Sequence, residues 1–352
     1  MPNISEIFRI IFSQTNFQSA IASSILIILL GFALGKMKIF PDTLAKGLTN
    51  VLLNVALPAL AFTAFMTDIN KQSLHQGLNL LIWGFIMYIL LIFVCELLYF
   101  KYKGDTKIAL VVCTIFGSTT FFGIPIISAL YGSEGVIYAN VFNISYRVFL
   151  YSYALIRMSG MKFETSNLKT IFLNPIIIAT FLGLFIWIFQ DYIPHVSVKS
   201  GDKIIEVAFL RIDKTIPWLF AAMRQLSGLT SPLAWLAIGI TLSQISAREA
   251  ASSKDAWYYS VNKVIILPLI NFVILLILTS MHIMNLSYVG LSVVIIMMAT
   301  PTATVAAAYA IKYDRAAVVA SNSSLLSTIF SVILIPIWII ILEIFKTLNI
   351  FS

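Results

Sequence analysis

The chain has 352 residues, of which 60% are hydrophobic and only 11% charged. A water-soluble domain carries about a quarter charged residues and could not hide this much apolar surface, so the composition excludes a soluble protein and also a disordered one. The net charge of +8 could suit a nucleic acid. The basic residues form no single patch, however, and sort by membrane side, so no nucleic-acid partner is expected.

Ten apolar stretches are each long enough to cross a bilayer, which takes about 20 residues. The predicted fold class is therefore an all-α polytopic membrane protein. Residues 1–17 lack a small-residue cleavage site and are expected to form an amphipathic lead-in. The spans cover about residues 16–36, 44–66, 77–100, 107–131, 135–158, 171–190, 217–245, 256–280, 287–311 and 315–345.

Lysine and arginine residues set the predicted orientation, because cytoplasmic loops carry an excess of them. They gather after every odd-numbered span: Lys36, Lys38, Lys46, Lys101, Lys103, Lys107, Arg157, Lys162, Lys169, Arg248, Lys254, Lys312 and Arg315. We expect these loops to face the cytoplasm and both termini to lie outside the cell membrane. The external insert 191–216 carries both signs of charge and alternates around Gly201-Asp202, which fits either a β-hairpin or an irregular loop.

The two halves of the chain resemble each other. Spans two and seven carry Pro58 and Pro232, and spans four and nine are both interrupted, at 116–125 and 298–304. Five spans per half is an odd number, so the second half must be inverted relative to the first. The sequence predicts two repeats, residues 1–160 and 161–352.

The interrupted spans are the candidate site. Broken helices at matching positions in two repeats indicate a binding site in mid-membrane, and the amide end of a half-helix favours an anion. A proline kink that serves only packing is the alternative. The candidate substrate-binding residues at the breaks are Ser118, Thr119, Thr120, Thr300, Pro301 and Thr302, with a further hydroxyl at Thr304, and the residues that interrupt the helices are Gly117, Gly123, Pro125 and Pro301.

The motifs at these breaks resemble those of the auxin efflux carrier family, over nearly all ten spans. They are Gly123-Ile-Pro125 with Leu130-Tyr-Gly132, Ser231-Pro-Leu-Ala, and Ala299-Thr-Pro301 followed by Ala310 and Tyr313-Asp. The resemblance implies that spans four and nine cross, that spans 1, 2, 6 and 7 form a scaffold, often dimeric, and that spans 3–5 and 8–10 move.

The resemblance also bears on the substrate. In the family the first break usually carries an Asn that binds the substrate carboxylate, and Ser118 stands there in this chain. Gly117 replaces the crossover proline of the plant carriers, whereas Pro301 matches the second one. The chain lacks the plant carriers' long central loop and is more similar to permeases for malate or malonate.

Ionisable residues inside spans are functional candidates because charge in the bilayer is costly. Arg147 lies near the middle of span five, on one helical face with Asn143 and close to Tyr146, and could bind a carboxylate through its planar fork. An arginine paired with backbone carbonyls is the alternative. Arg224 and Lys263 are expected to extend to an interface, and Glu96 to be an interfacial acid.

The residues that are missing narrow the function further. No Asp lies deep in a span, which favours uniport or exchange over ion coupling. Cys95, Cys113 and the three scattered histidines give no disulfide or metal spacing, so no cofactor, metal or enzyme activity is expected. The asparagines at 50, 54, 140 and 322 are expected to serve interhelical hydrogen bonds. An anion channel, a sensor-like protein and a lipid enzyme are the alternatives to a small-organic-anion carrier.

Overall fold

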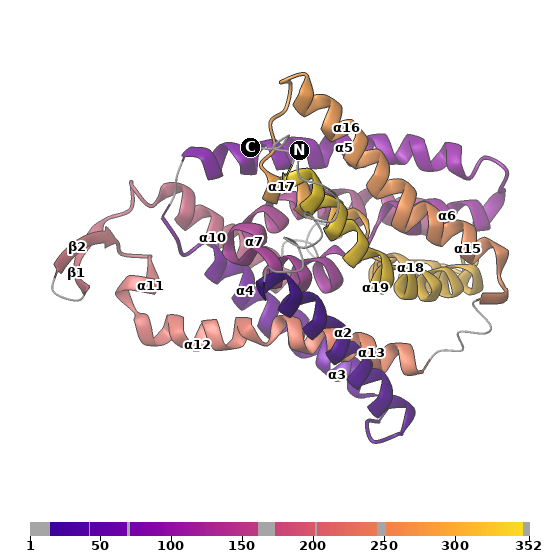
Figure 1. Cartoon of the computed structure of the whole chain (residues 1–352), viewed down its shortest axis with the longest axis horizontal. Helices are drawn as coiled ribbons and strands as arrows, with labels where there is room; N and C mark the ends of the chain where they lie inside the picture. The colour runs from indigo at the N-terminus through magenta and orange to yellow at the C-terminus, as the bar shows by residue number, and fades with distance from the viewer. Residues whose placement is uncertain are drawn as a thin grey trace.

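The computed structural model describes residues 15–41, 43–68, 71–160, 173–200, 203–244 and 251–347. The first half of the chain folds into α2 (Thr15–Lys36), α3 (Leu44–Val51), η1 (Leu52–Ala56), α4 (Leu57–Ala64), α5 (Lys71–Leu98), α6 (Gly104–Ile115), η2 (Thr119–Gly123), α7 (Ile124–Phe149), η3 (Leu150–Ala154) and α8 (Leu155–Ser159) (Figure 1). The η elements are π-helical turns inside longer helices. Nearly all of the predicted lead-in 1–17 lies outside the described residues.

The second half folds into helices and one hairpin. Its elements are α10 (Pro175–Phe189), β1 (His195–Ser200), β2 (Lys203–Ala208), α11 (Ile212–Thr215), α12 (Pro217–Gly228), α13 (Thr230–Ser243), α15 (Lys254–Val261), η4 (Asn262–Ile266), α16 (Leu267–Ser280), α17 (Tyr288–Met298), α18 (Thr304–Lys312) and α19 (Ala317–Thr347). Strands β1 and β2 pair antiparallel, with His195 opposite Ala208. The hairpin alternative for the insert 191–216 is thus confirmed.

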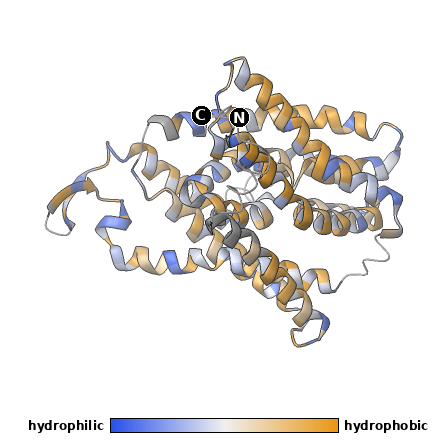
Figure 2. Cartoon of the chain, in the orientation of Figure 1, coloured by the Kyte–Doolittle hydropathy of each residue, from blue (hydrophilic) through white to orange (hydrophobic). Residues whose placement is uncertain are grey.

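The helices are apolar along most of their length and polar near their ends (Figure 2). Six helical stretches in the described part of the chain are long and apolar enough to cross a membrane. Three shorter apolar helices accompany them: Ile25–Lys36, Pro175–Phe189 and Tyr288–Met298. In a bilayer, helices satisfy their own backbone groups, which water cannot do there. The chain is therefore a multi-pass membrane protein.

The helix pairs follow a pattern that relates the two halves of the chain. Helix α2 lies against α13, and α10 lies against α4; α5 packs on α7, and α15 packs on α19. Helices α2 and α13 approach closely at Gly31, where a Cβ would lie 2.6 Å from the Leu236 carbonyl oxygen. Small residues of this kind let membrane helices approach closely. When each predicted span is matched with the one five places along, the α2–α13 pair corresponds to the α10–α4 pair, and the α5–α7 pair corresponds to the α15–α19 pair.

One end of the bundle is held by ion pairs between helix ends. Glu96 lies 2.7 Å from Lys107 and also pairs with Arg157, and Arg315 pairs with Asp105. The loops after α5, α8 and α18, all predicted to be cytoplasmic, therefore meet on one side. Glu96 lies near a helix end, among these charges.

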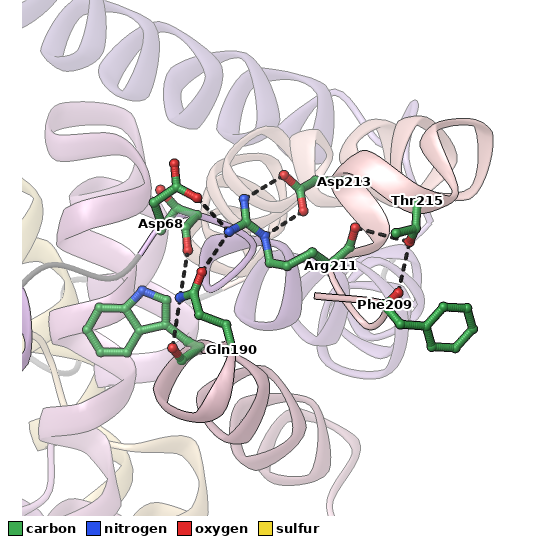
Figure 3. A network of polar contacts seen from close by, with 8 residues as sticks. Asp68, Gln190, Phe209, Arg211, Asp213 and Thr215 are labelled. Carbon is green, nitrogen blue, oxygen red and sulfur yellow. Dashed lines mark hydrogen bonds and ion pairs between the residues drawn. The ribbon is translucent and has the colours of Figure 1, made fainter. Parts of the chain in front are cut away.

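The opposite end is held by Arg211, which lies just after the hairpin and forms a network of polar contacts (Figure 3). Its guanidinium donates to both carboxylate oxygens of Asp213 at 2.8 Å, to Asp68 at 2.7 Å and to the Gln190 side chain at 2.9 Å. The hydrogen bonds to Asp213 hold the pKa of Arg211 above its ordinary value, because they favour the charged form. This arginine ties the insert to the ends of α4 and α10.

Candidate functional site

The two interrupted helices meet at their interruptions. Helix α6 ends at Ile115 and η2 begins at Thr119, whereas α17 ends at Met298 and α18 begins at Thr304. Between them, Gly117 and Thr302 form an antiparallel bridge. The Ser118 N–H donates to the Pro301 carbonyl at 2.7 Å, and the Ala303 N–H donates to the Phe116 carbonyl at 2.9 Å. Backbone groups freed by one break are thus satisfied by the other.

The glycines at the first break permit this approach. A Cβ on Gly117 would run into Thr300 Oγ1 and would lie 2.9 Å from Lys263 Nζ. A Cβ on Gly123 would lie 2.7 Å from the Met297 sulfur. The Pro125 carbonyl accepts a hydrogen bond from Ser231 of α13 at 3.0 Å, which links the break to the packing partner of α2.

The carbonyl ends of the broken helices are capped by side chains. Lys263 Nζ donates to the Thr114 carbonyl at 2.9 Å, Tyr259 donates to the Cys113 carbonyl at 2.8 Å, and Ser331 donates to the Ala299 carbonyl at 2.9 Å. These donors come from α15, η4 and α19. The orphan carbonyls that every helix C-terminus leaves are therefore largely satisfied within the protein.

The amide ends have no such caps. Neither Ser118 before η2 nor Ala303 before α18 forms a side-chain cap in the described structure. Both ends border one cavity of about 310 Å³. It is lined by Thr49, Leu53, Asn54, Ser118, Thr120, Phe121, Tyr146, Arg147, Leu150, Tyr151, Asn174, Pro175, Ile176, Ala303, Thr304 and Val305. Two positive dipole ends therefore face the same space.

Arg147 adds a full positive charge to this cavity. The residue is only 7% exposed. Its guanidinium makes no hydrogen bond or ion pair with a described residue, and Nη2 is buried without a partner. The Tyr146 ring beside it packs edge-on against Phe116 at the break, with ring centroids 5.9 Å apart. A buried cation without a counter-charge is unfavourable, so the cavity is suited to receive an anion.

The structure brings together part of the predicted residue set. Ser118, Thr120, Tyr146 and Arg147 line the cavity, and so does Thr304. Thr119 and Asn143 are fully buried and lie outside its lining. Thr300 donates to the Met297 carbonyl, Thr302 bonds to Tyr259 and Ser327, and the Pro301 carbonyl accepts the hydrogen bond from the Ser118 N–H.

Other residues that line the cavity were not predicted from the sequence. Tyr151 follows Arg147 by one helical turn, a spacing that could have indicated it. Asn54, expected to serve interhelical bonding, lines the cavity and donates to the Asn50 carbonyl of its own helix at 2.9 Å. Asn174 caps α10 through a bond from the Ile176 N–H, and no sequence signal placed it at the site.

Two buried charges also differ from expectation. The sequence predicts that Lys263 extends to an interface, but it is completely buried against the end of α6 and Gly117 of the first break. Glu343 of α19 is 5% exposed and accepts a hydrogen bond from Tyr288. This acid stands near the end of the last predicted span, so its position in the sequence did not indicate a buried charge.

A second polar cavity, of about 410 Å³, lies toward the other ends of the helices. Its lining includes Thr63 and Thr67 after η1, Ser128 and Ser133 on either side of the kink at Gly132, and Arg224 of α12. The first cavity instead involves Thr49 before η1 and Asn174 at the start of α10. The two cavities therefore lie toward opposite ends of the bundle.

A bundle of apolar helices that holds a polar cavity at paired helix breaks is typical of membrane transporters, not of enzymes. Comparison with known proteins agrees. The chain belongs to the membrane transport protein family, whose model matches residues 17–170 and 161–339. This is the auxin efflux carrier family that the motifs at the breaks indicated.

Two archaeal relatives are similar along nearly their whole length. An uncharacterized transporter of Methanocaldococcus jannaschii is 23% identical over 328 residues, which are 89% of this chain and 95% of that protein. An uncharacterized transporter of Methanothermobacter thermautotrophicus is 24% identical over 334 residues, 92% of this chain and 97% of that protein. The protein is thus a membrane transporter and not an enzyme.

Proposed function

We propose that the protein is a secondary carrier of small organic anions, of the malate type, in the cytoplasmic membrane. The observation that carries the proposal is the convergence of two uncapped helix amide ends and the unpartnered Arg147 on one cavity. The amide groups and the Ser118 hydroxyl would bind one carboxylate. The Arg147 fork would bind the second carboxylate of a dicarboxylate.

The size and lining of the cavity favour this class of substrate. Its volume of about 310 Å³ lies at the small end of the range for ligand sites. No Asp or Glu is among the lining residues, so the described site offers a coupling cation no carboxylate. We therefore expect uniport or exchange, driven by gradients and by the membrane potential.

The architecture that we propose is a five-plus-five inverted repeat of ten spans, with spans four and nine crossing. The β-bridge between Gly117 and Thr302 and the helix pairs that recur in both halves support it. Helices α2, α4, α10 and α13 would form the scaffold, and a homodimer through these helices fits the family resemblance. The helices from α5 to α8 and from α15 to α19 would form the moving unit.

The two cavities support alternating access as the mechanism. The cavity at Arg147 reaches helix ends that border predicted cytoplasmic loops, and the cavity at Arg224 borders predicted external ones. The structure would then be inward-facing, with both termini outside. Movement of the broken helices against the scaffold would transfer an anion from one cavity to the other.

Transport into proteoliposomes tests the proposal. We expect uptake of labelled malate, malonate or lactate that saturates with concentration and that falls in Arg147→Ala and Pro301→Ala. Lys199→Ala, in the exposed hairpin, is the control and should transport normally. Rapid, non-saturating currents in planar bilayers would show a channel instead. Unchanged uptake in both site variants would overturn the assignment of Arg147 and Pro301 to the substrate site.

A further inference from the structure

Lys263 is a buried lysine that the proposed substrate site does not use. It lies on the π-turn η4, is 0% exposed and forms no ion pair with a described residue. Its hydrogen-bond partner among the described residues is the Thr114 carbonyl, at 2.9 Å from Nζ. An ammonium held in this way has given up its hydration for one carbonyl, so its position needs a reason beyond packing.

The groups around it are neutral or engaged elsewhere. Cys95 of α5 and Cys113 of α6 are the titratable groups close to it, and both are free thiols. Tyr259, one turn away, donates to the Cys113 carbonyl. Glu96, the acid next to Cys95, is paired with Lys107 and Arg157. In the described structure no carboxylate neutralises Lys263.

Its location is the crossing itself. Thr114 is the penultimate residue of α6, so its carbonyl belongs to the negative end of the broken helix. A Cβ on Gly117 would lie 2.9 Å from Nζ, so the ammonium lies against the backbone of Gly117, the residue before Ser118. In ion-coupled carriers, carbonyls at half-helix ends of this kind coordinate the coupling cation.

We propose that the Lys263 ammonium is the resident cation of the crossing and occupies the place where a cation-coupled carrier binds its ion. It compensates the carbonyl end of α6 and positions Gly117, so that the amide ends on the cavity side can hold the anion. Transport then requires a positive charge at residue 263 and no external alkali cation. This inference rests on the proposed function.

Three measurements on purified protein in proteoliposomes test it. Wild-type uptake of labelled malate should be the same in sodium, potassium and choline chloride. Lys263→Ala and the neutral donor Lys263→Gln should each lose at least about tenfold in uptake rate, as for loss of a charged hydrogen bond. Lys107→Ala, which removes a lysine paired with Glu96 at a helix end, is the matched control and should lose less.

Chemical rescue separates the charge from the fold. Ethylammonium chloride should restore uptake in Lys263→Ala, whereas choline chloride, which has no N–H donor, should not. Ethylammonium should also raise the unfolding temperature of Lys263→Ala and leave wild type unchanged, a readout that needs no transported substrate. The unfolding temperature still decides the inference if none of malate, malonate and lactate is transported.

Two results would overturn the resident-cation inference. One is normal uptake by Lys263→Gln, which would show that the charge is dispensable while the organic-anion proposal stands. The other is sodium-dependent uptake by wild type, which would show that an external ion fills the place. Absence of rescue in both uptake and thermal stability, in a Lys263→Ala protein that is folded, would also count against it.

Discussion

Two buried arginines of this protein have opposite surroundings. Arg211 is 4% exposed and Arg147 is 7% exposed, so both have lost most of their water. Arg211 donates four hydrogen bonds, to Asp213, Asp68 and Gln190. The Arg147 guanidinium has no hydrogen-bond partner among the described residues and borders a cavity.

The difference shows how a structural charge is told from a functional one. The partners of Arg211 come from within the chain, so its charge contributes to holding the fold. Arg147 has its neighbours Tyr146 and Tyr151 but no carboxylate, so its compensation must come from outside. A ligand anion would supply that charge, which supports the proposal that Arg147 binds the substrate.

The largest expected effect is on ligand binding by Arg147→Ala. Removing one partner of a buried charge pair costs about 2–5 kcal/mol, so the Kd for malate should rise about 30-fold or more. Thermal stability without ligand should hold or increase, because an uncompensated buried charge is removed. Ligand-induced shifts of the unfolding temperature measure both effects. A variant that loses stability but binds malate normally would indicate that Arg147 stabilises the fold and does not bind the ligand.

Arg211→Ala should show the opposite pattern. The variant leaves Asp213 unpaired and frees the insert from α4 and α10, so the free energy of unfolding should fall by about 3 kcal/mol. Malate binding, measured on protein that remains folded at low temperature, should be unchanged. Thermal unfolding of Arg147→Ala and Arg211→Ala compares the two arginines directly. A defect in malate binding by Arg211→Ala would contradict a purely structural role for Arg211.

Arg147→Lys distinguishes the charge from the planar fork. Lysine keeps the positive charge but cannot hold a carboxylate through two parallel bonds. We expect about a tenfold loss of affinity for a dicarboxylate, and a smaller loss for a monocarboxylate such as lactate. Competition between the two acids for labelled malate measures the ratio. An equal loss for both acids would argue against a second-carboxylate site at Arg147.

The smallest expected effect comes from Ser118→Ala. One hydroxyl donor is removed while the backbone amides remain, so affinity should fall about fivefold, as for one hydrogen bond of about 1 kcal/mol. Thr300→Ala is the matched control, because its hydroxyl donates to the Met297 carbonyl and lies outside the cavity lining. A larger effect from the Thr300 variant would shift the site toward the second break.

Much of the fold could be predicted from local features of the sequence. Apolar stretches gave the helices, because a chain in hydrocarbon must satisfy its backbone groups within each helix. Gly117, Pro301 and their neighbours indicated where two helices would be interrupted, because glycine and proline weaken a helix wherever they stand. The alternation around Gly201-Asp202 indicated a hairpin, although it did not exclude an irregular loop.

The candidate site could be predicted only in part. Ser118, Thr120, Tyr146 and Arg147 stood out by type and position, and they line one cavity. Asn54 and Asn174 belong to helices that approach the break from elsewhere in the chain, and nothing in their local sequence indicated it. Asn143 shares a helical face with Arg147, yet it is fully buried outside the cavity lining.

The sequence by itself determined that this is a membrane protein, where its helices run and where two of them break, since hydropathy and backbone conformation act over a few residues. Only the tertiary structure decided what each buried charge meets. Lys263 lies against the end of α6, Arg211 is fully partnered and Arg147 borders a cavity, because such contacts join residues far apart in the chain.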